Sequence, residues 1–155
     1  MQVEWDKCSL TELDITATDL STECLIDLLT RITNLRFLSA GQINGFNDSV
    51  LKAWQEMGNP RTLISLDLDS SDNISDEALN KFITRYGSQL HACILSGMTH
   101  ITDQLWMAIM QHLTNAKILV MGTSERLGVN IHVDQLMDAI ACNCSKLERL
   151  ELRFD

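Results

Sequence analysis

The feature that most constrains the fold of this chain is an internal repeat, whose clearest copy spans residues 62–86. The copy opens with Leu63, Leu66 and Leu68, and the last two alternate as a half-buried strand requires. The spacing then changes to three and four residues, as on the apolar side of a helix, at Ile74, Ala78, Leu79, Phe82 and Ile83. Ser75 precedes that stretch and can cap the helix with its hydroxyl oxygen. One copy therefore predicts a strand, a turn and a capped helix.

The same unit recurs along nearly the whole chain. Its first apolar position falls at Leu10, Leu35, Leu63, Leu90, Ala116 and Leu147. The inward positions of six predicted strands are Leu10/Leu13/Ile15, Leu35/Leu38/Ala40, Leu63/Leu66/Leu68, Leu90/Cys93/Leu95, Ala116/Leu119/Met121 and Leu147/Leu150/Leu152. The helix entry recurs as Phe46-Asn47-Asp48, Ile74-Ser75-Asp76 and Ile101-Thr102-Asp103, and in a shortened form as Leu20-Ser21-Thr22. Because one such unit cannot bury its own apolar face, the units must stack.

Two segments resemble a known family of repeats. The run Cys144-Ser-Lys-Leu147-Glu-Arg-Leu150-Glu-Leu152 and the tripeptide Ile101-Thr102-Asp103 are similar to cysteine-containing leucine-rich repeats of F-box proteins. The chain departs from that family at four positions where it often has Cys or Asn, namely Thr18, Ile43, Ser71 and Met98. These departures concern the subfamily and leave the repeat architecture unaffected.

The predicted fold class is α/β, a right-handed leucine-rich-repeat solenoid with a parallel inner sheet and outer helices. We expect one domain of about six repeats over residues 1–155. Few residues precede the first predicted strand, and the sixth repeat stops after its strand, so we expect a piece or a short form of a longer solenoid. The alternative is that residues 1–5 add an edge strand and that the last repeat simply ends at its strand.

Charge and cysteine content restrict the partners and the compartment. The formal net charge of −9 argues against nucleic acid, whose phosphates are bound by Lys and Arg. The five cysteines are an odd number, and Cys24 and Cys93 fall on apolar positions, which favours free thiols in a reducing compartment. The sequence has no charged-then-apolar leader and no apolar run of membrane-spanning length. We therefore expect the cytoplasm, the nucleus or both, and no membrane partner.

The candidate binding site is the sheet surface between the inward positions, where side chains point away from the helices. Acidic residues gather there on repeats one and three, apolar residues on two, four and five, and arginines on the last. We predict that a protein partner contacts Glu12, Asp14, Phe37, Ser39, Asp67, Asp69, Ile94, Val120, Arg149, Glu151 and Arg153. The alternative is that the apolar members are the scattered surface residues common on any protein.

The fifth repeat is longer than the others. Its extra residues lie within 121–133, and insertions in repeat proteins map to loops on one face. This segment is either a binding loop or an irregular connection whose apolar residues fold back on the core.

No arrangement of residues indicates catalysis. The histidines His91, His100, His112 and His132 have no nucleophile or carboxylate at the spacing of a known catalytic or zinc motif. Asp48, Asp76 and Asp103 recur like ligands, but they also occupy the first turn of predicted helices, where the helix dipole favours negative charge. We therefore expect no enzyme activity, no metal and no cofactor.

The predicted function is protein binding. The resemblance implies the substrate-recognition part of an SCF-type (cullin-RING) ubiquitin ligase. The F-box is not among these residues, so a ligase adaptor is expected as a partner only if an F-box exists in the parent chain. The alternative is a stand-alone leucine-rich-repeat scaffold in a protein complex with no ligase role.

Overall fold

The computed structural model describes residues 4–123 and 133–154. Its strands are Glu12–Asp14 (β1), Phe37–Ser39 (β2), Ser65–Asp67 (β3), Ala92–Leu95 (β4), Ile118–Thr123 (β5) and Arg149–Phe154 (β6). Its α-helices are Thr22–Arg31 (α1), Asp48–Met57 (α2), Asp76–Tyr86 (α3), Asp103–Met110 (α4) and Val133–Asn143 (α5). Short 3-10 helices cover Trp5–Lys7 (η1), Pro60–Thr62 (η2) and Gly87–Gln89 (η3).

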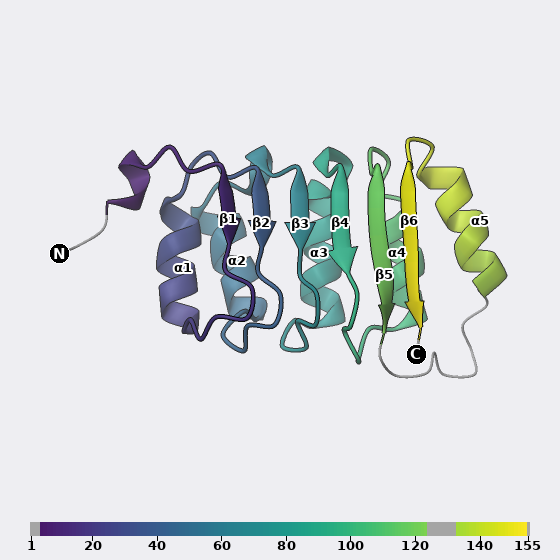
Figure 1. Ribbon diagram of the computed structural model, residues 1–155, viewed down its shortest axis with the longest axis horizontal. Coiled ribbons are helices and arrows are strands. Elements are labelled where there is room, and N and C mark those ends of the chain that lie inside the picture. The colour runs from purple at the N-terminus through teal and green to yellow at the C-terminus, as the bar shows by residue number, and fades with distance from the viewer. Residues whose placement is uncertain (1–3, 124–132, 155) are drawn as a thin grey trace.

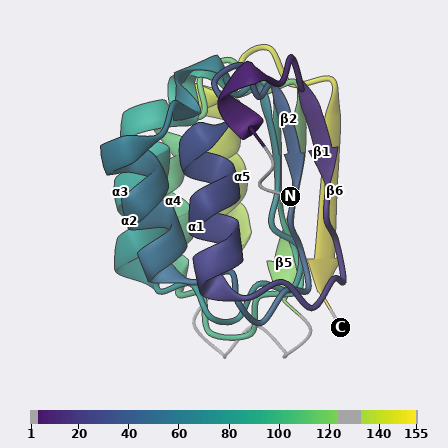
Figure 2. The ribbon, with the colours of Figure 1, turned by 90° about the vertical axis from the view of Figure 1, so that its left-hand side faces the viewer.

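The strands form one parallel sheet in the order β1-β2-β3-β4-β5-β6, which is also their order in the chain. All five helices cover the same side of that sheet, and the chain advances from strand to helix to strand with a right-handed turn (Figures 1 and 2). In Figure 2 the outermost strands β1 and β6 lie farther from the helices than β2 and β5, so the uncovered side is concave. The predicted fold class, a leucine-rich-repeat solenoid, is confirmed.

The core lies between the sheet and the helices. Its sheet side includes a central row of paired residues, Leu13, Leu38, Leu66, Cys93, Leu119 and Leu150. The four central members of this row are buried, whereas Leu13 and Leu150 at the two outer strands are partly buried. The helices contribute large side chains such as Trp54, Phe82 and Trp106. Each repeat therefore buries its apolar residues against its neighbours, as the repeat pattern predicts.

Four helices begin with the caps that the repeat predicts. Ser21, Asn47, Ser75 and Thr102 each accept a hydrogen bond from a backbone N–H of the first turn. The aspartates that follow two of these caps also bond to the next repeat. Asp48 accepts from the Ser75 N–H at 2.7 Å and the Ser75 hydroxyl at 2.6 Å, and Asp76 accepts from Thr102 in the same way. Their recurrence is therefore explained by structural bonds between repeats.

The opposite edge of the solenoid, where the strands begin, is also bonded from repeat to repeat. The Thr62 hydroxyl donates to the Leu35 carbonyl at 2.6 Å, and the Asn59 amide donates to the Thr33 carbonyl at 2.9 Å. The Asn115 amide donates to the Ser88 carbonyl at 2.6 Å in a later repeat. Adjacent repeats are thus connected at both ends of the strands, which makes the sheet between them a rigid surface.

Three expectations differ from the structure or fall outside it. Cys24 is exposed, because it lies on the solvent side of α1. Trp5 begins the 3-10 helix η1, so it does not extend an edge strand. Most of the predicted insertion, residues 124–132, lies outside the described residues. No helix in the described part of the chain has the length and apolar character needed to cross a membrane.

Candidate functional site

The side of the sheet without helices, here called the open face, presents side chains in rows that run across the strands. The first row is Glu12, Phe37, Ser65, Ala92, Ile118 and Arg149. The second row is Asp14, Ser39, Asp67, Ile94, Val120 and Glu151. Asp69 lies two residues beyond the end of β3, Arg153 lies two residues farther along β6, and both line this face. The structure therefore brings all eleven predicted site residues onto one face.

One of these residues is not exposed as predicted. Val120 is only 3% exposed, although it points away from the helices. It lies between Ile94 and Glu151 in the register, so its neighbours in the row are both longer side chains. Phe37, in contrast, is 38% exposed, which agrees with the predicted register. The accessible apolar residues over β4 and β5 are instead the half-buried Ile94 and Ile118.

The acidic part of the open face is centred on β3. Asp67 is half-buried, and its Oδ1 accepts a hydrogen bond from the Asp69 N–H at 3.0 Å. Loss of solvent on burial raises the pKa of Asp67, and the hydrogen bond from the Asp69 N–H lowers it in part. The negative charges of Asp69 and Asp14 also raise this pKa, so the net shift is upward. The Asp67 carboxylate is therefore held where its negative charge is poorly compensated.

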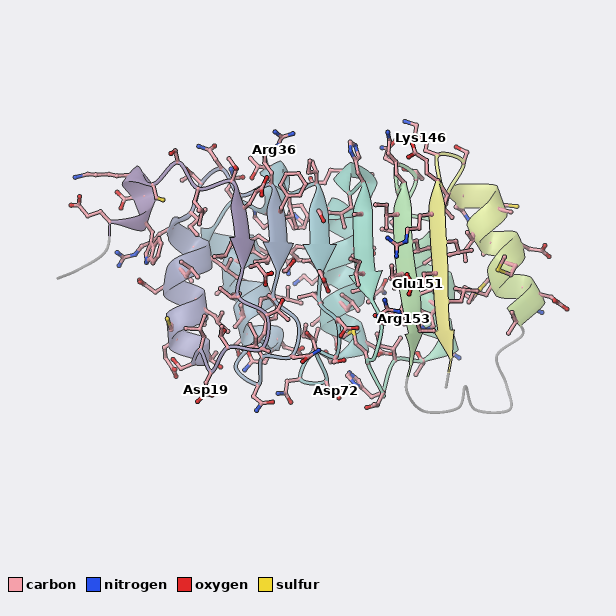
Figure 3. The ribbon with its side chains drawn as sticks, in the orientation of Figure 1. Asp19, Arg36, Asp72, Lys146, Glu151 and Arg153 are labelled. Atoms are coloured by element: carbon pink, nitrogen blue, oxygen red, sulfur yellow. The ribbon has the colours of Figure 1, made fainter. Side chains whose placement is uncertain are left out.

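The β6 part of the open face carries an ionic cluster. Glu151 accepts from Arg149 Nη2 at 2.8 Å and from Arg153 Nε at 2.6 Å. The hydrogen bonds from Arg153 and then Arg149 lower the pKa of Glu151, and the same Glu151 bond raises the pKa of Arg153. Figure 3 shows Glu151 and Arg153 together on this side of the sheet. The two guanidinium groups are thus already engaged within the chain.

Between these two charged parts lies a pocket of about 420 Å³, here called the open-face pocket. It is lined by Thr16, Ser65, Asp67, Asp69, Ala92, Ile94, Ile118, Val120, Arg149, Glu151 and Arg153. Sequence reasoning left four of these residues out of the predicted site, namely Thr16, Ser65, Ala92 and Ile118. The alternation of strand side chains places all four on the open face and could have identified them. The pocket has an apolar floor between an acidic wall and a mixed ionic wall.

Replacing Phe37 by alanine is expected to leave stability almost unchanged. The ring lies on the open face and is 38% exposed, so its removal opens no cavity in the core. We expect the free energy of unfolding to change by less than about 1 kcal/mol, as for most surface substitutions. Thermal unfolding followed by circular dichroism measures this change. A loss of several kcal/mol would show that Phe37 belongs to the core and that the register of β2 is shifted by one residue.

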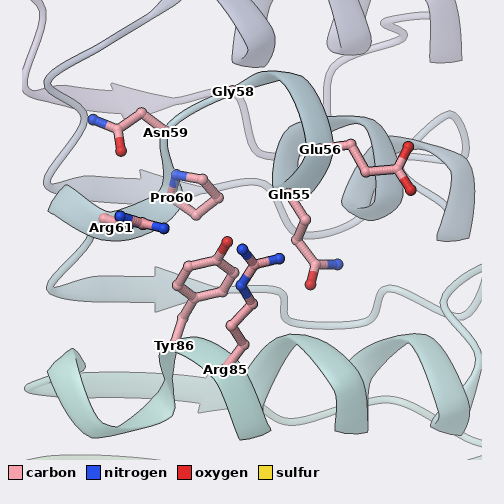
Figure 4. Close-up of a pocket in the computed structure, with 8 residues that line it drawn as sticks. All are labelled: Gln55, Glu56, Gly58, Asn59, Pro60, Arg61, Arg85 and Tyr86. Atoms are coloured by element: carbon pink, nitrogen blue, oxygen red, sulfur yellow. The ribbon is translucent and has the colours of Figure 1, made fainter.

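A second pocket, of about 350 Å³, lies where α2 ends (Figure 4). It is lined by Gln55, Glu56, Gly58, Asn59, Pro60, Arg61, Arg85 and Tyr86. Arg85 lies over the Tyr86 ring at 5.3 Å, and Figure 4 shows the Tyr86 hydroxyl between the Arg61 and Arg85 side chains. These cations share the pocket with Glu56 and with the negative end of the α2 dipole. Its mixed charges favour no single class of ligand.

The described residues contain no group of three or more His, Cys, Asp or Glu side chains that could hold a metal ion. The five cysteines are all free thiols, as expected. Burial raises the pKa of the Cys93 thiol to about 12, so this residue is a core side chain and a poor nucleophile.

Comparison with known proteins supports the fold alone. No family model and no curated protein matches the sequence. Among solved structures, the tropomodulin C-terminal domain of Caenorhabditis elegans is similar with a TM-score of 0.67 and 13% identity, over 92% of this chain and 87% of that domain. A chain of the yeast Rad7 and Elc1 complex is similar with a TM-score of 0.64 and 18% identity, over 94% of this chain. The present chain spans only 42% of that second chain.

Proposed function

We propose that this chain is a protein-interaction module that holds its partner on the open face. The observation that carries the proposal is the open-face pocket, in which Ile94 and Ile118 lie between charged side chains of β3 and β6. Apolar residues surrounded by polar ones are typical of protein interfaces, in which the centre excludes water and the rim stays hydrated. The rows of paired strands hold this surface in one shape, which reduces the entropy lost on binding.

We also propose that the module is not an enzyme. The open face offers carboxylates, guanidinium groups and aliphatic side chains, and no histidine, serine–base pair or thiolate lines its pocket. The two solved structures with this fold support the proposal only at the level of fold, which does not by itself determine function.

The more specific proposal is a substrate-recognition part of an SCF-type ubiquitin ligase, acting in the cytoplasm or the nucleus. It is supported by the sequence resemblance to F-box leucine-rich-repeat proteins. The yeast neighbour, whose structure was solved as a complex of two proteins, is compatible with a role in a protein assembly. A scaffold without a ligase role is the alternative and uses the same face.

The test is an affinity purification from cell lysate with three forms of the chain as bait. The first is the wild type, and the second is a face variant with Phe37→Ala, Ile94→Thr and Ile118→Thr, which keeps branched residues in β4 and β5. Val120 is left intact because it is buried, and a polar residue there would endanger the fold. The control variant, Met57→Ala with Met107→Ala, removes two exposed apolar side chains from the helical side.

We expect the wild type and the control variant to recover the same partner protein in similar amounts. The face variant should recover at least about tenfold less of it, since each apolar side chain buried in an interface contributes about 1.5–3 kcal/mol to the binding free energy. Circular dichroism first establishes that all three are folded. Recovery of cullin-RING subunits with the parent protein favours the ligase role, and their absence favours the scaffold. Equal recovery by the face variant would contradict binding on the open face.

A further inference from the structure

We infer that the open face takes a basic segment of its partner, with a lysine or arginine against Asp67 and a neighbouring apolar side chain over Ile94 and Ile118. This inference rests on the proposed function and names the chemistry of the partner. It depends on how Asp67 differs from the other charged groups of the same face.

Asp67 is the half-buried carboxylate of the open-face pocket that has an oxygen available to a partner. It lies in the second row between Ser39 and Ile94, and it lines the open-face pocket. Its Oδ1 accepts one hydrogen bond, from the Asp69 N–H, while no described residue donates to its Oδ2 or forms an ion pair with it. A half-buried carboxylate with one oxygen free is well placed to accept a charge-assisted hydrogen bond.

Asp69, its neighbour, is already satisfied by neutral donors. Its Oδ1 accepts from the Ser96 hydroxyl, and its Oδ2 accepts from the Ser70 hydroxyl at 3.1 Å and the Gln42 amide at 3.3 Å. These bonds fix its position without cancelling its charge. Asp69 therefore adds negative potential beside Asp67 and leaves Asp67 as the point of contact.

The cations on the open face do not neutralise this charge. Arg149 and Arg153 both donate to Glu151, and the described ion pairs on this face involve only these three residues. Arg153 has only a weak stabilising effect on the ionised form of Asp67 compared with burial and the charges of Asp69 and Asp14. The open face carries five carboxylates and two guanidinium groups, so it attracts a cation and repels an anion.

The space next to Asp67 suits a long basic side chain. Ser65, two residues before Asp67 on the same face of β3, and its partner Ala92 on β4 are small and partly exposed, and both line the pocket. The methylene groups of a lysine or arginine can lie on such a surface while the charged end reaches the carboxylate. Ile94 is paired with Asp67, and Ile118 is paired with Ala92, so an adjacent apolar side chain meets the floor of the same pocket.

The probe for this inference is a library of random linear peptides displayed on phage, selected against the immobilised chain. We expect enrichment of peptides with Lys or Arg next to an aliphatic or aromatic residue. A selected peptide is then labelled, and its affinity is measured by fluorescence anisotropy for the wild type, Asp67→Asn and Asp19→Asn. Asp19→Asn is the matched control, because it makes the same charge change at an exposed position at the lower edge of the solenoid (Figure 3).

We expect Asp67→Asn to weaken peptide binding by about tenfold or more, because the variant loses a hydrogen bond between two charged groups. Asp19→Asn should bind as the wild type does. Replacing the basic residue of the peptide by Gln should reduce its affinity for the wild type by a similar factor. The same replacement should reduce its affinity for Asp67→Asn only slightly, because the contact is already lost in that variant. Higher salt should weaken wild-type binding.

The outcomes separate this inference from the proposed function. Peptides that depend on Ile94 and Ile118, but bind wild type and Asp67→Asn equally, would overturn the basic-segment inference and leave the open face as an interface. Selection of peptides without basic residues would do the same. Peptides unaffected by every open-face substitution, or no selected peptide at all, would count against both.

The same substitution is expected to make the protein slightly more stable near neutral pH. Since the pKa of Asp67 is raised in the folded state, ionisation of Asp67 lowers stability as the pH rises through that pKa. Asn keeps the acceptor for the Asp69 N–H and removes the charge. We expect Asp67→Asn to raise the melting temperature by about 1–3 °C at pH 7, and the gain to disappear below about pH 4, where the wild-type carboxyl is protonated. A lower melting temperature at pH 7 would show that the charge of Asp67 has a structural role.

Discussion

Replacing Leu66 by aspartate is expected to unfold the chain. Leu66 is fully buried (0% exposed) in the middle of β3, where it pairs with Leu38 on one side and Cys93 on the other. A carboxylate at this position has no partner among the surrounding apolar residues, and its burial costs several kcal/mol. Because the total stability of a domain is about 5–15 kcal/mol, most or all of it is lost. Circular dichroism should show loss of the cooperative thermal transition.

Ser65→Asp is the control for that experiment. Ser65 directly precedes Leu66 in β3 and points to the open face, so a carboxylate there stays in contact with water. We expect the variant to fold and to melt within a few degrees of the wild type. If Leu66→Asp folded while Ser65→Asp did not, the register of β3 would be shifted by one residue and every side chain of the strand would change faces.

Replacing Trp54 by alanine is expected to cost about 3–5 kcal/mol, which is the usual range for a large aromatic residue in a core. Trp54 on α2 is 1% exposed and stacks on Phe82 of α3, with 5.4 Å between the ring centroids. The substitution leaves a cavity between two repeats and removes this aromatic contact. Urea unfolding measures the loss as a change in the free energy of unfolding.

A double-mutant cycle isolates the contact between the two helices. Trp54→Ala, Phe82→Leu and the double variant should give a coupling energy of about 0.5–1.5 kcal/mol. The exposed Met57 on the same helix provides the control, and Met57→Ala should cost less than about 0.5 kcal/mol. If the changes in unfolding free energy of Trp54→Ala and Phe82→Leu simply added in the double variant, α2 and α3 would not stabilise each other through these rings.

The fold could be predicted because several independent signals in each repeat agree. The spacing of Leu63, Leu66 and Leu68 determines which side of β3 is buried, and Ser75 marks the start of α3. Each signal is local, since it depends on residues a few positions apart. Repetition then fixed the order of the strands, because a unit that must stack on its copies places consecutive strands side by side.

The candidate site could be predicted only in part, because exposure depends on neighbours from other repeats. The alternation within β5 placed Val120 on the open face, as observed, but it could not show that Val120 is buried between Ile94 of β4 and Glu151 of β6. Likewise, the engagement of Arg149 and Arg153 by Glu151, which leaves Asp67 uncompensated, requires side-chain distances. Cys24 was wrongly assigned to the apolar side of α1, since a short helix allows more than one placement of its apolar side.

The hydrogen bonds between repeats restrict how such a protein can change in length during evolution. Asp48 bonds to Ser75, and Asp76 bonds to Thr102, across separations of 27 and 26 residues, while Thr62 reaches Leu35 across 27 on the other edge. Duplication or loss of one whole unit recreates donors opposite acceptors along both edges. Gain or loss of a few residues inside a unit moves one partner of each bond away from the other. Natural length variation should therefore occur in whole units, or in connections that take no part in either set of bonds.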